Sequence, residues 1–191
     1  WLNIHPMLLM LAYTGFAKRV NGEVVCDKRW LFGSLHAGPG ELFVPVVKFS
    51  HREMPARLDV EIVTGETTEE YTRLNIDLPR PTPFCCRICP LGTVDRLARI
   101  MQMDEDVQVG WEEFDKQFVI KTNDPAMARM AVTRKVQQEL LTLKLWRRPK
   151  YSHQTSKYPE LTILDNTLRV RIVLLSQVEN LMQFYEACGR I

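Results

Sequence analysis

The stretch from Glu112 to Leu143 constrains the fold more than any other part of this chain. Phe114 to Thr122 mixes aromatic and β-branched residues with charged ones, a pattern that predicts a half-buried strand. The Asn-Asp-Pro sequence that follows ends the strand, because Asp124 is a favourable N-cap and Pro125 is a favourable first residue of a helix. A helix is therefore predicted to begin at Pro125.

This predicted helix is amphipathic and extends to about Leu143. Polar and charged residues separate its apolar positions, so that one apolar stripe faces a core. The stripe consists of Ala128, Val132, Val136, Leu140 and Leu143. A strand that leads directly into such a helix predicts a helix lying on a sheet.

Three short motifs around this stretch form a wider pattern. Tyr71-Thr72-Arg73 lies in an extended strand, Glu113-Phe114-Asp115 leads an apolar strand, and Asn123-Asp124 precedes a helix. The pattern resembles a family of uncharacterised bacterial α+β domains, some of which follow a membrane anchor. The resemblance covers Gly65 to about Leu143 well and the two ends of the chain loosely. It implies a fold and assigns no catalytic residues.

Short apolar runs between turn residues predict an antiparallel sheet. Leu42 to Phe49, Leu58 to Val63 and Tyr71 to Leu78 each read as a strand. The turn sequence at 64–68 joins the second run to the third, which predicts a meander of antiparallel strands. Apolar runs on both sides of Asp165-Asn166 predict a further hairpin.

Helices are also predicted near both ends of the chain. Pro6 to Ala17 is almost continuously apolar, long enough for a buried core helix and too short to span a membrane. A truncated amphipathic membrane segment is the alternative for this region. Near the other end, a capping box at 176–179 predicts a final helix. Its apolar face consists of Val178, Leu181, Met182, Tyr185 and Cys188.

These elements predict an α+β fold, in which amphipathic helices cover an antiparallel sheet built as a meander of short strands. At 191 residues, the chain suits one α+β domain, 1–191. A subdivision into a strand-rich part, 1–90, and a helix-strand-helix-hairpin-helix part, 91–191, is the alternative. We expect a cytoplasmic protein, peripheral to the membrane or following an N-terminal anchor upstream of Trp1.

Composition and motifs exclude several functional classes. The hydrophobic fraction of 46% is that of a folded protein rather than a disordered one. A net charge of +2 is too balanced to indicate a nucleic-acid partner. The sequence has no G-x-S-x-G, P-loop, G-x-G-x-x-G or H-E-x-x-H motif, and its four histidines are isolated. We therefore predict no catalytic residues and no cofactor.

A cysteine cluster is one candidate site. Cys85, Cys86 and Cys89 include a single C-x-x-C spacing, which zinc knuckles and thiol oxidoreductases use. Structural zinc needs two further ligands, and a redox motif normally opens a helix, whereas this segment reads as extended and continues into Pro90. Buried strand cysteines are the preferred interpretation. Zinc binding by Cys86 and Cys89, or thiol redox chemistry of the cluster, is the alternative.

A basic and aromatic loop after Leu143 is the other candidate site. Guanidinium groups bind anions, and Trp and Tyr side chains suit interfaces. A solvated loop is the simpler interpretation, and contact with a protein partner or a membrane surface is the functional one. The residues concerned are Trp146, Arg147, Arg148, Lys150 and Tyr151.

Together these observations favour a non-enzymatic interaction domain with a protein partner, acting as an extrinsic accessory subunit of a membrane-associated assembly. The alternative is a small-molecule-binding or metal-binding protein that uses Cys85, Cys86 and Cys89. The two hypotheses differ in where the functional residues lie, because one uses an exposed surface and the other uses a strand of the sheet.

Overall fold

The computed structural model describes residues 6–31, 40–64, 68–91, 105–143 and 159–191. The strands in these ranges are β1 (Glu23–Leu31), β2 (Gly40–His51), β3 (Met54–Thr64), β4 (Thr68–Asp77), β5 (Cys86–Pro90), β6 (Glu105–Asp106), β7 (Phe118–Thr122), β8 (Glu160–Leu164) and β9 (Thr167–Val173). They form one sheet in the order β1-β2-β3-β4-β9-β8-β5-β7-β6, and neighbouring strands pair antiparallel. An α+β fold with an antiparallel sheet is confirmed.

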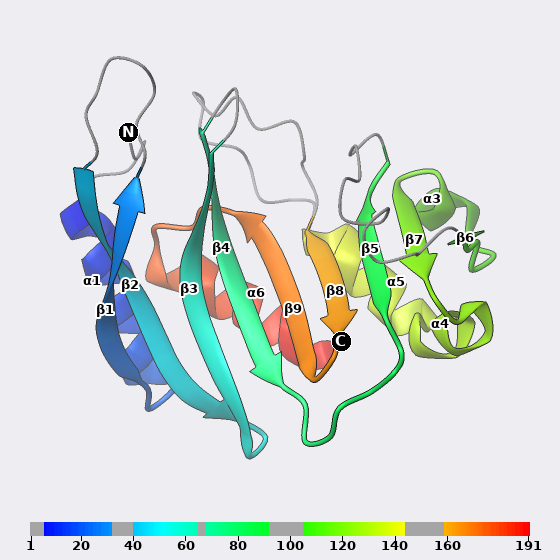
Figure 1. Cartoon of the computed structure of the whole chain (residues 1–191), viewed down its shortest axis with the longest axis horizontal. Coiled ribbons are helices and arrows are strands. Elements are labelled where there is room, and N and C mark those ends of the chain that lie inside the picture. The colour runs from blue at the N-terminus through cyan, green and yellow to red at the C-terminus, as the bar shows by residue number, and fades with distance from the viewer. Residues whose placement is uncertain (1–5, 32–39, 65–67, 92–104, 144–158) are drawn as a thin grey trace.

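The helices in the described ranges are α1 (Pro6–Arg19), α3 (Glu112–Asp115), α4 (Pro125–Ala131), α5 (Arg134–Thr142) and α6 (Val178–Arg190). Helices α1, α5 and α6 lie behind one face of the sheet, whereas α3 and α4 lie beside β7 (Figure 1). Figure 1 shows α1 behind β1 and β2, α6 behind the middle strands, and α5 behind β8 and β5. The helix α1 contacts both β2 and α6, and α5 contacts α6. The opposite face of the sheet is turned toward the viewer in the same figure.

The hydrophobic core follows the strand register on the helix side. One row of directly opposed apolar residues crosses the sheet from β1 to β7, because alternate residues of each strand point to the same face. The row runs through Val24, Val47, Leu58, Leu74, Val170, Leu161, Ile88 and Ile120. All of them except Val24 are buried.

Helix α1 packs closely against this core and against α6. Its buried side includes Tyr13 and Phe16, and the ring of Phe16 meets the ring of Tyr185 edge to face at 5.8 Å. A Cβ placed on Gly15 would come 2.6 Å from a methyl carbon of Val178, so the glycine permits the close approach of α1 and α6. The outer side of α1 is also apolar, and this helix is therefore not amphipathic.

The strand predicted from Phe114 to Thr122 begins later, at Phe118. The earlier residues form the one-turn helix α3 instead. Gly110, with φ of +83°, makes a turn before the helix, and the Asp115 carboxylate accepts a hydrogen bond of 3.0 Å from the Gly110 backbone N–H. Phe114 then stacks on Phe118 with ring centroids 4.7 Å apart. The prediction was wrong here because the strand-like composition of the segment did not reveal this local turn.

The predicted start of the next helix is confirmed. Asp124 is the N-cap of α4, its carboxylate accepts from the Met127 backbone N–H at 2.9 Å, and Pro125 is the first helical residue. The apolar stripe predicted along the segment is buried throughout. The stripe consists of Ala128, Val132, Val136, Leu140 and Leu143.

The single helix predicted from Pro125 to Leu143 is instead two helices. Val132 adopts φ of −84° and ψ of 63°, which ends α4, and Thr133 caps α5 by accepting from the Val136 N–H at 3.4 Å. The Gln137 side chain donates to the backbone oxygen of Val132 at 2.8 Å and satisfies this acceptor at the break. Both halves of the segment can therefore bury their apolar residues although the axis changes.

The C-terminal elements match the sequence in part. The hairpin at Asp165-Asn166 joins β8 and β9 and is confirmed, with Asp165 at φ of 55°. The final helix is present, but its N-cap is Gln177, which makes no side-chain capping bond. The predicted capping box is therefore wrong at this position.

Candidate functional site

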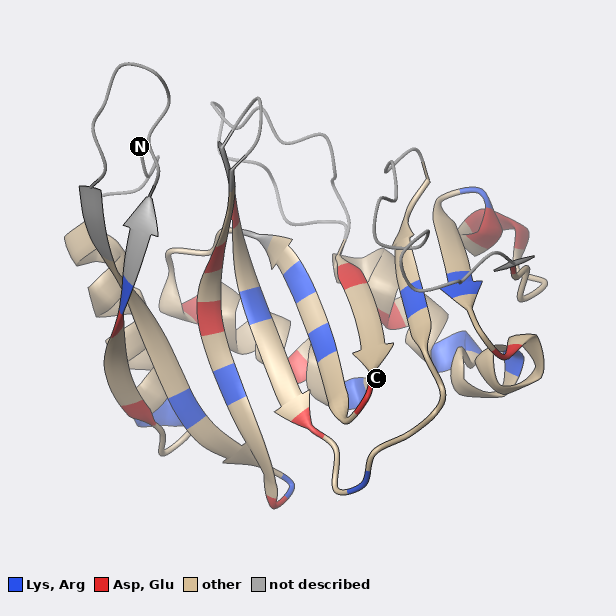
Figure 2. Ribbon diagram, in the orientation of Figure 1, with Lys and Arg blue, Asp and Glu red and all other residues tan. Residues whose placement is uncertain are grey.

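Charged residues of both signs recur along the middle strands of the sheet, as the red and blue bands on the ribbon in Figure 2 show. Strand register brings them together. Asp59 on β3 lies opposite Arg73 on β4, which lies opposite Arg171 on β9. Arg171 in turn lies opposite Glu160 on β8. This row alternates with the apolar row on the helix side, as the pleat of the strands requires.

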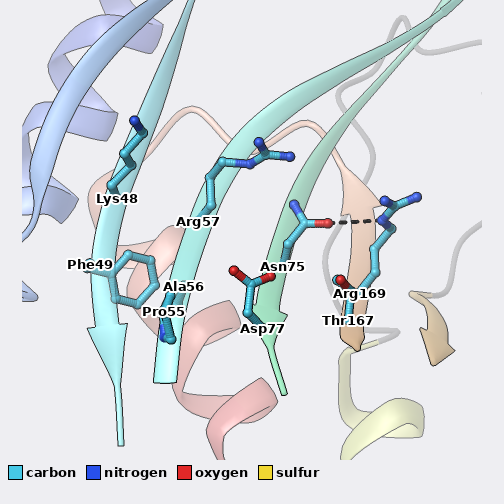
Figure 3. Close-up of a pocket in the computed structure, with 9 residues that line it drawn as sticks. All are labelled: Lys48, Phe49, Pro55, Ala56, Arg57, Asn75, Asp77, Thr167 and Arg169. Atoms are coloured by element: carbon cyan, nitrogen blue, oxygen red, sulfur yellow. Dashed lines mark hydrogen bonds between the residues drawn. The ribbon is translucent and has the colours of Figure 1, made fainter. Parts of the chain in front are cut away.

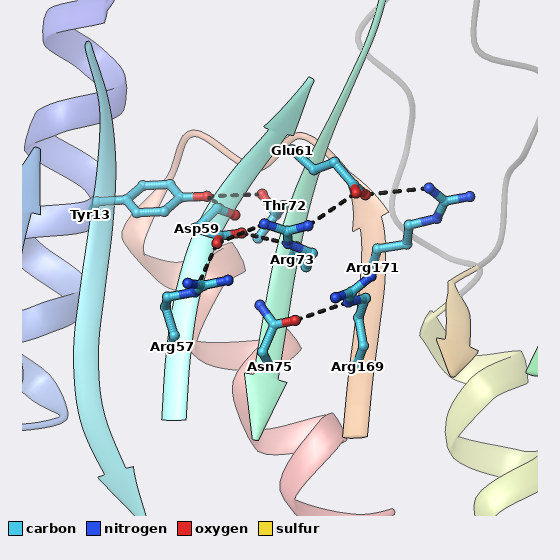
Figure 4. Close-up of polar contacts among 9 residues, drawn as sticks. All are labelled: Tyr13, Arg57, Asp59, Glu61, Thr72, Arg73, Asn75, Arg169 and Arg171. Carbon is cyan, nitrogen blue, oxygen red and sulfur yellow. Dashed lines mark hydrogen bonds and ion pairs between the residues drawn. The ribbon is translucent and has the colours of Figure 1, made fainter. Parts of the chain in front are cut away.

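Asp59 is the centre of the first half of this network (Figure 4). Its side chain is only 1% exposed. Arg73 binds it with two hydrogen bonds, Nε to Oδ1 at 2.8 Å and Nη2 to Oδ2 at 2.9 Å. Arg57 adds a contact from Nε to Oδ2 at 3.0 Å. The buried carboxylate is thus paired with two guanidinium groups, which offsets the cost of removing its charge from water.

The second half of the network continues across the sheet to β5. Glu61 accepts from Arg73 Nη1 at 3.0 Å and from Arg171 Nη1 at 3.3 Å. Glu160 accepts from Arg171 Nε at 2.8 Å and pairs with Arg87 Nε at 2.6 Å. Positive and negative side chains therefore alternate from Arg57 to Arg87. We call these seven residues the ion-pair network: Arg57, Asp59, Glu61, Arg73, Arg87, Glu160 and Arg171.

The pKa values of the central arginines follow from these contacts. Burial alone lowers the pKa of Arg73, but hydrogen bonds to Asp59 and the charges of Asp59 and Glu61 outweigh it, so the pKa is raised. At Arg171, burial also lowers the pKa. The charge of Glu160 and its hydrogen bond to Arg171 outweigh this effect, so the pKa of Arg171 is raised. Both guanidinium groups therefore remain charged in the folded protein.

A buried polar contact ties this network to α1. The Tyr13 hydroxyl lies 3.3 Å from Thr72 Oγ1 and 3.4 Å from the backbone oxygen of Asp59 (Figure 4). Thr72 Oγ1 also accepts from the Leu175 backbone N–H at 2.8 Å. Burial, together with the charge of Asp59, raises the pKa of Tyr13 well above its usual value, so this hydroxyl stays neutral.

A shallow pocket of about 380 Å³ lies beside the network, on β2, β3, β4 and β9 (Figure 3). Basic side chains dominate the polar part of its lining, namely Lys48, Arg57 and Arg169, with one carboxylate from Asp77. Asn75 lies between the two arginines, and its Oδ1 accepts from Arg169 Nε at 3.0 Å. A lining of this kind suits the binding of a negatively charged group.

The cysteine cluster does not converge on a common point. Cys86 and Cys89 are both buried in β5, but alternation places Cys86 on the helix side and Cys89 beside Arg87 on the other face. Burial, with a contribution from Cys85, raises the pKa of Cys86 to about 12, the opposite of what a reactive thiol needs. Cys85 is half-buried, and its sulfur faces the backbone oxygen of Pro83 at 3.8 Å.

In the described part of the chain, no group of three or more His, Cys, Asp and Glu side chains is placed to hold a metal ion. The basic loop falls outside the described residues, so its part in binding stays a prediction. The residues concerned are Trp146, Arg147, Arg148, Lys150 and Tyr151.

Sequence reasoning missed the ion-pair network. Alternation along the predicted strands places Asp59, Glu61 and Arg73 opposite the apolar side, but it does not indicate that Asp59 is buried. A usable signal was present in the opposite charges on neighbouring strands, acidic at 59 and 61 and basic at 73. Using it required the strand register, which also brings Arg171 and Glu160 from the far end of the chain into the same row.

None of the described helices is both long and apolar enough to cross a membrane.

Comparison with known proteins identifies a solved structure with a similar fold. No family model matches the sequence and no curated protein matches it, so the resemblance to bacterial α+β domains stays a prediction. A solved structure, that of the mycobacterial trehalose monomycolate transport factor A, TtfA, matches with a TM-score of 0.52 over 96% of each chain. At 13% identity, this similarity shows a shared fold and nothing more.

Proposed function

We propose that this protein is a non-enzymatic accessory domain of a membrane-associated assembly, and that it binds a protein partner through α1. The observation that carries the proposal is the apolar outer side of this helix. Leu8 and Leu11 are 56% and 61% exposed, and they lie three positions apart, on one side of α1. Met7 extends the same side.

Single exposed leucines are common on soluble proteins and need no explanation. Here, however, they lie together on a helix whose other side is already fully packed against β2 and α6. Burying both leucines at an interface removes apolar surface from water, which is the main favourable contribution to most protein associations. The contact that we propose would therefore use the outer side of α1 without disturbing the core.

The shared fold supports the accessory role indirectly. The neighbour of similar fold is described as a transport factor for trehalose monomycolate. We extend the proposal by analogy to an accessory role in lipid transport, with the chain acting through binding rather than chemistry. The ion-pair network fits this view, because its carboxylates are paired with arginines rather than left available for chemistry.

The test is affinity purification of the tagged full-length protein from native membranes. The variant that carries Leu8→Gln and Leu11→Gln should lose the co-purifying partner, because both changes put polar groups into the proposed contact. Met130→Gln is the matched control, since Met130 is 66% exposed on α4, on a different helix. Recovery of the unaltered protein as a lone soluble monomer, or equal loss of the partner in the control, would contradict the proposal.

The basic loop provides a second arm of the same experiment. Replacing Arg147, Arg148 and Lys150 with glutamine should weaken association in a salt-dependent manner if the loop contacts an anionic partner or membrane surface. The melting temperature of the same variant shows whether the three substitutions act on association alone or also on folding. Unchanged association at low salt would identify the loop as a solvated surface and leave α1 as the proposed contact.

A further inference from the structure

A row of basic residues crosses the open face of the sheet beside the ion-pair network. Lys48 lies opposite Arg57, and Arg57 lies opposite Asn75. Asn75 lies opposite Arg169 on the next strand. Neighbouring strands are about 5 Å apart, so the backbones of Arg57 and Arg169 flank Asn75 at a separation of about 10 Å. These four residues are among those that line the pocket, and Figure 3 shows their side chains on the four strands.

Asn75 places an unused hydrogen-bond donor in this pocket. Its side chain is buried, with 5% of the residue exposed, and its Nδ2 has no hydrogen-bond partner within the described ranges. The orientation of the amide follows from its neighbour. Arg169 Nε can only donate, so the atom that it meets at 3.0 Å must be the Asn75 oxygen. A buried N–H without an acceptor is unfavourable, and a ligand oxygen would satisfy it.

The charges around Asn75 are also unbalanced. Arg57 contacts Asp59 through Nε, which leaves its two terminal nitrogens available, and Lys48 forms no ion pair with any described residue. Burial, followed by the positive charge of Arg73, lowers the pKa of Arg169, and the charges of Glu61 and Asp59 oppose this shift only in part. Within the lining of the pocket, Lys48, Arg57 and Arg169 accompany the single carboxylate of Asp77. Asp59 pairs with Arg57 at one nitrogen, so positive charge remains in excess around Asn75.

We propose that this pocket binds an oxyanion of the phosphate class. One oxygen would accept from Asn75 Nδ2 and others from the guanidinium groups of Arg57 and Arg169, with Lys48 adding positive charge at the rim. Inorganic phosphate and the phosphate of an anionic lipid headgroup present the same chemistry, and a pocket of about 380 Å³ admits either. The pocket lies on the face of the sheet opposite the helices, so phosphate binding there is independent of the contact proposed for α1.

Two binding measurements on the full chain distinguish the sources. Calorimetric titration with inorganic phosphate at low salt tests the free ion, and flotation with vesicles of phosphatidylglycerol in phosphatidylcholine tests the headgroup. Saturable binding in either measurement supports the site and identifies the source. Arg57→Gln, Arg169→Gln and Asn75→Asp should each weaken that binding by about tenfold or more, because each removes or opposes a charge-assisted hydrogen bond.

Arg129→Gln is the matched control, because it removes one positive charge from an exposed position on α4. It should change the affinity by less than about twofold. Asp77→Asn should strengthen binding several-fold, since it removes the opposing carboxylate, and a gain of affinity cannot arise from misfolding. The proposal is overturned by absence of saturable binding in both measurements, by equal losses in Arg129→Gln and Arg57→Gln, or by unchanged affinity in Asp77→Asn.

Discussion

At the scale of single residues, Asp59 shows how a buried charge is tolerated in this sheet. Its carboxylate is almost fully removed from water, and it is held by both Arg73 and Arg57. The net contribution of such a group to stability is small, because desolvation offsets the attraction. Removing one partner is different, since it leaves the remaining charge buried and poorly paired.

We therefore predict that Arg73→Met lowers the free energy of unfolding by about 3–5 kcal/mol. Methionine keeps much of the side-chain volume but cannot pair with Asp59 or Glu61. Arg19→Met is the control, because the pair of Arg19 with Glu179 is exposed on both sides and should contribute less than about 1 kcal/mol. Urea unfolding measures both values. A loss below about 1 kcal/mol for Arg73→Met would show that Arg57 alone is sufficient to pair Asp59.

The five cysteines, none of which forms a disulfide, give a second prediction at this scale. Thiolates react with iodoacetamide, so an exposed thiol reacts readily, whereas a buried thiol of raised pKa does not. Cys26 should be alkylated first in the native protein, while Cys86 and Cys188 stay protected until the chain unfolds. Mass spectrometry after brief alkylation, with and without urea, identifies the labelled residues. Rapid native labelling of Cys86 would revive the thiol redox alternative.

At the scale of elements, side-chain caps decide where helices begin. Asp124 caps α4 with a well-formed hydrogen bond, and Thr133 caps α5 immediately after the break at Val132. The segment can therefore change direction while both helices keep their apolar sides on the core. Ser176, in contrast, makes no capping bond to α6, although its sequence context predicts one.

This difference predicts unequal effects of two similar substitutions. Asp124→Ala should lower the unfolding free energy by about 1 kcal/mol, because it removes the acceptor for the Met127 N–H. Asp124→Asn should restore most of that loss, since asparagine is also a good N-cap. Ser176→Ala should have little effect. Chemical denaturation of the three variants is the measurement, and equal losses for Asp124→Ala and Ser176→Ala would mean that a capping bond also forms at Ser176.

At the scale of the whole molecule, the turn between β2 and β3 is joined to the C-terminal helix. His51 Nδ1 lies 2.9 Å from the Tyr185 hydroxyl, and Arg52 donates to the backbone oxygen of Gly189 at 2.8 Å. The ring of Tyr185 also packs edge to face on Phe49 at 5.4 Å. These contacts connect residues more than 130 positions apart in the chain, so they report on the assembly of the sheet with α6.

The His51 contact predicts a pH dependence. Burial, followed by the positive charge of Arg52, lowers the pKa of His51 below its usual value. The unfolded chain therefore binds this proton at a higher pH than the folded chain does, and stability should fall as the pH drops below about 6.5. Carboxylates titrate near pH 4 and act mainly below this window.

Urea unfolding at pH 7, 6 and 5 measures the effect, with His51→Gln as the comparison. The variant should lose less stability than the unaltered protein between pH 7 and pH 5, because it lacks the titrating ring. The effect should be modest, since His51 is only partly buried. Parallel pH profiles for the two proteins would exclude His51 as the cause.

Features that depend on neighbouring residues could be predicted from the sequence. Alternation at Leu58 to Val63 and at Tyr71 to Leu78 was sufficient to predict two strands, since each side chain's face follows from its position in the pleat. Asp124 and Pro125 were sufficient to predict the start of a helix, because capping acts within one turn. The buried stripe from Ala128 to Leu143 followed from the same local periodicity.

Features that depend on the register between distant strands could not be predicted in this way, because they arise when the whole sheet assembles. The row of Asp59, Arg73, Arg171 and Glu160 joins residues about a hundred positions apart, and a shift of one residue in any pairing would place them on opposite faces. The same register places Asn75 between Arg57 and Arg169. Local sequence patterns do not determine this pairing, because burial and packing across the whole sheet decide which strands are neighbours and how they align.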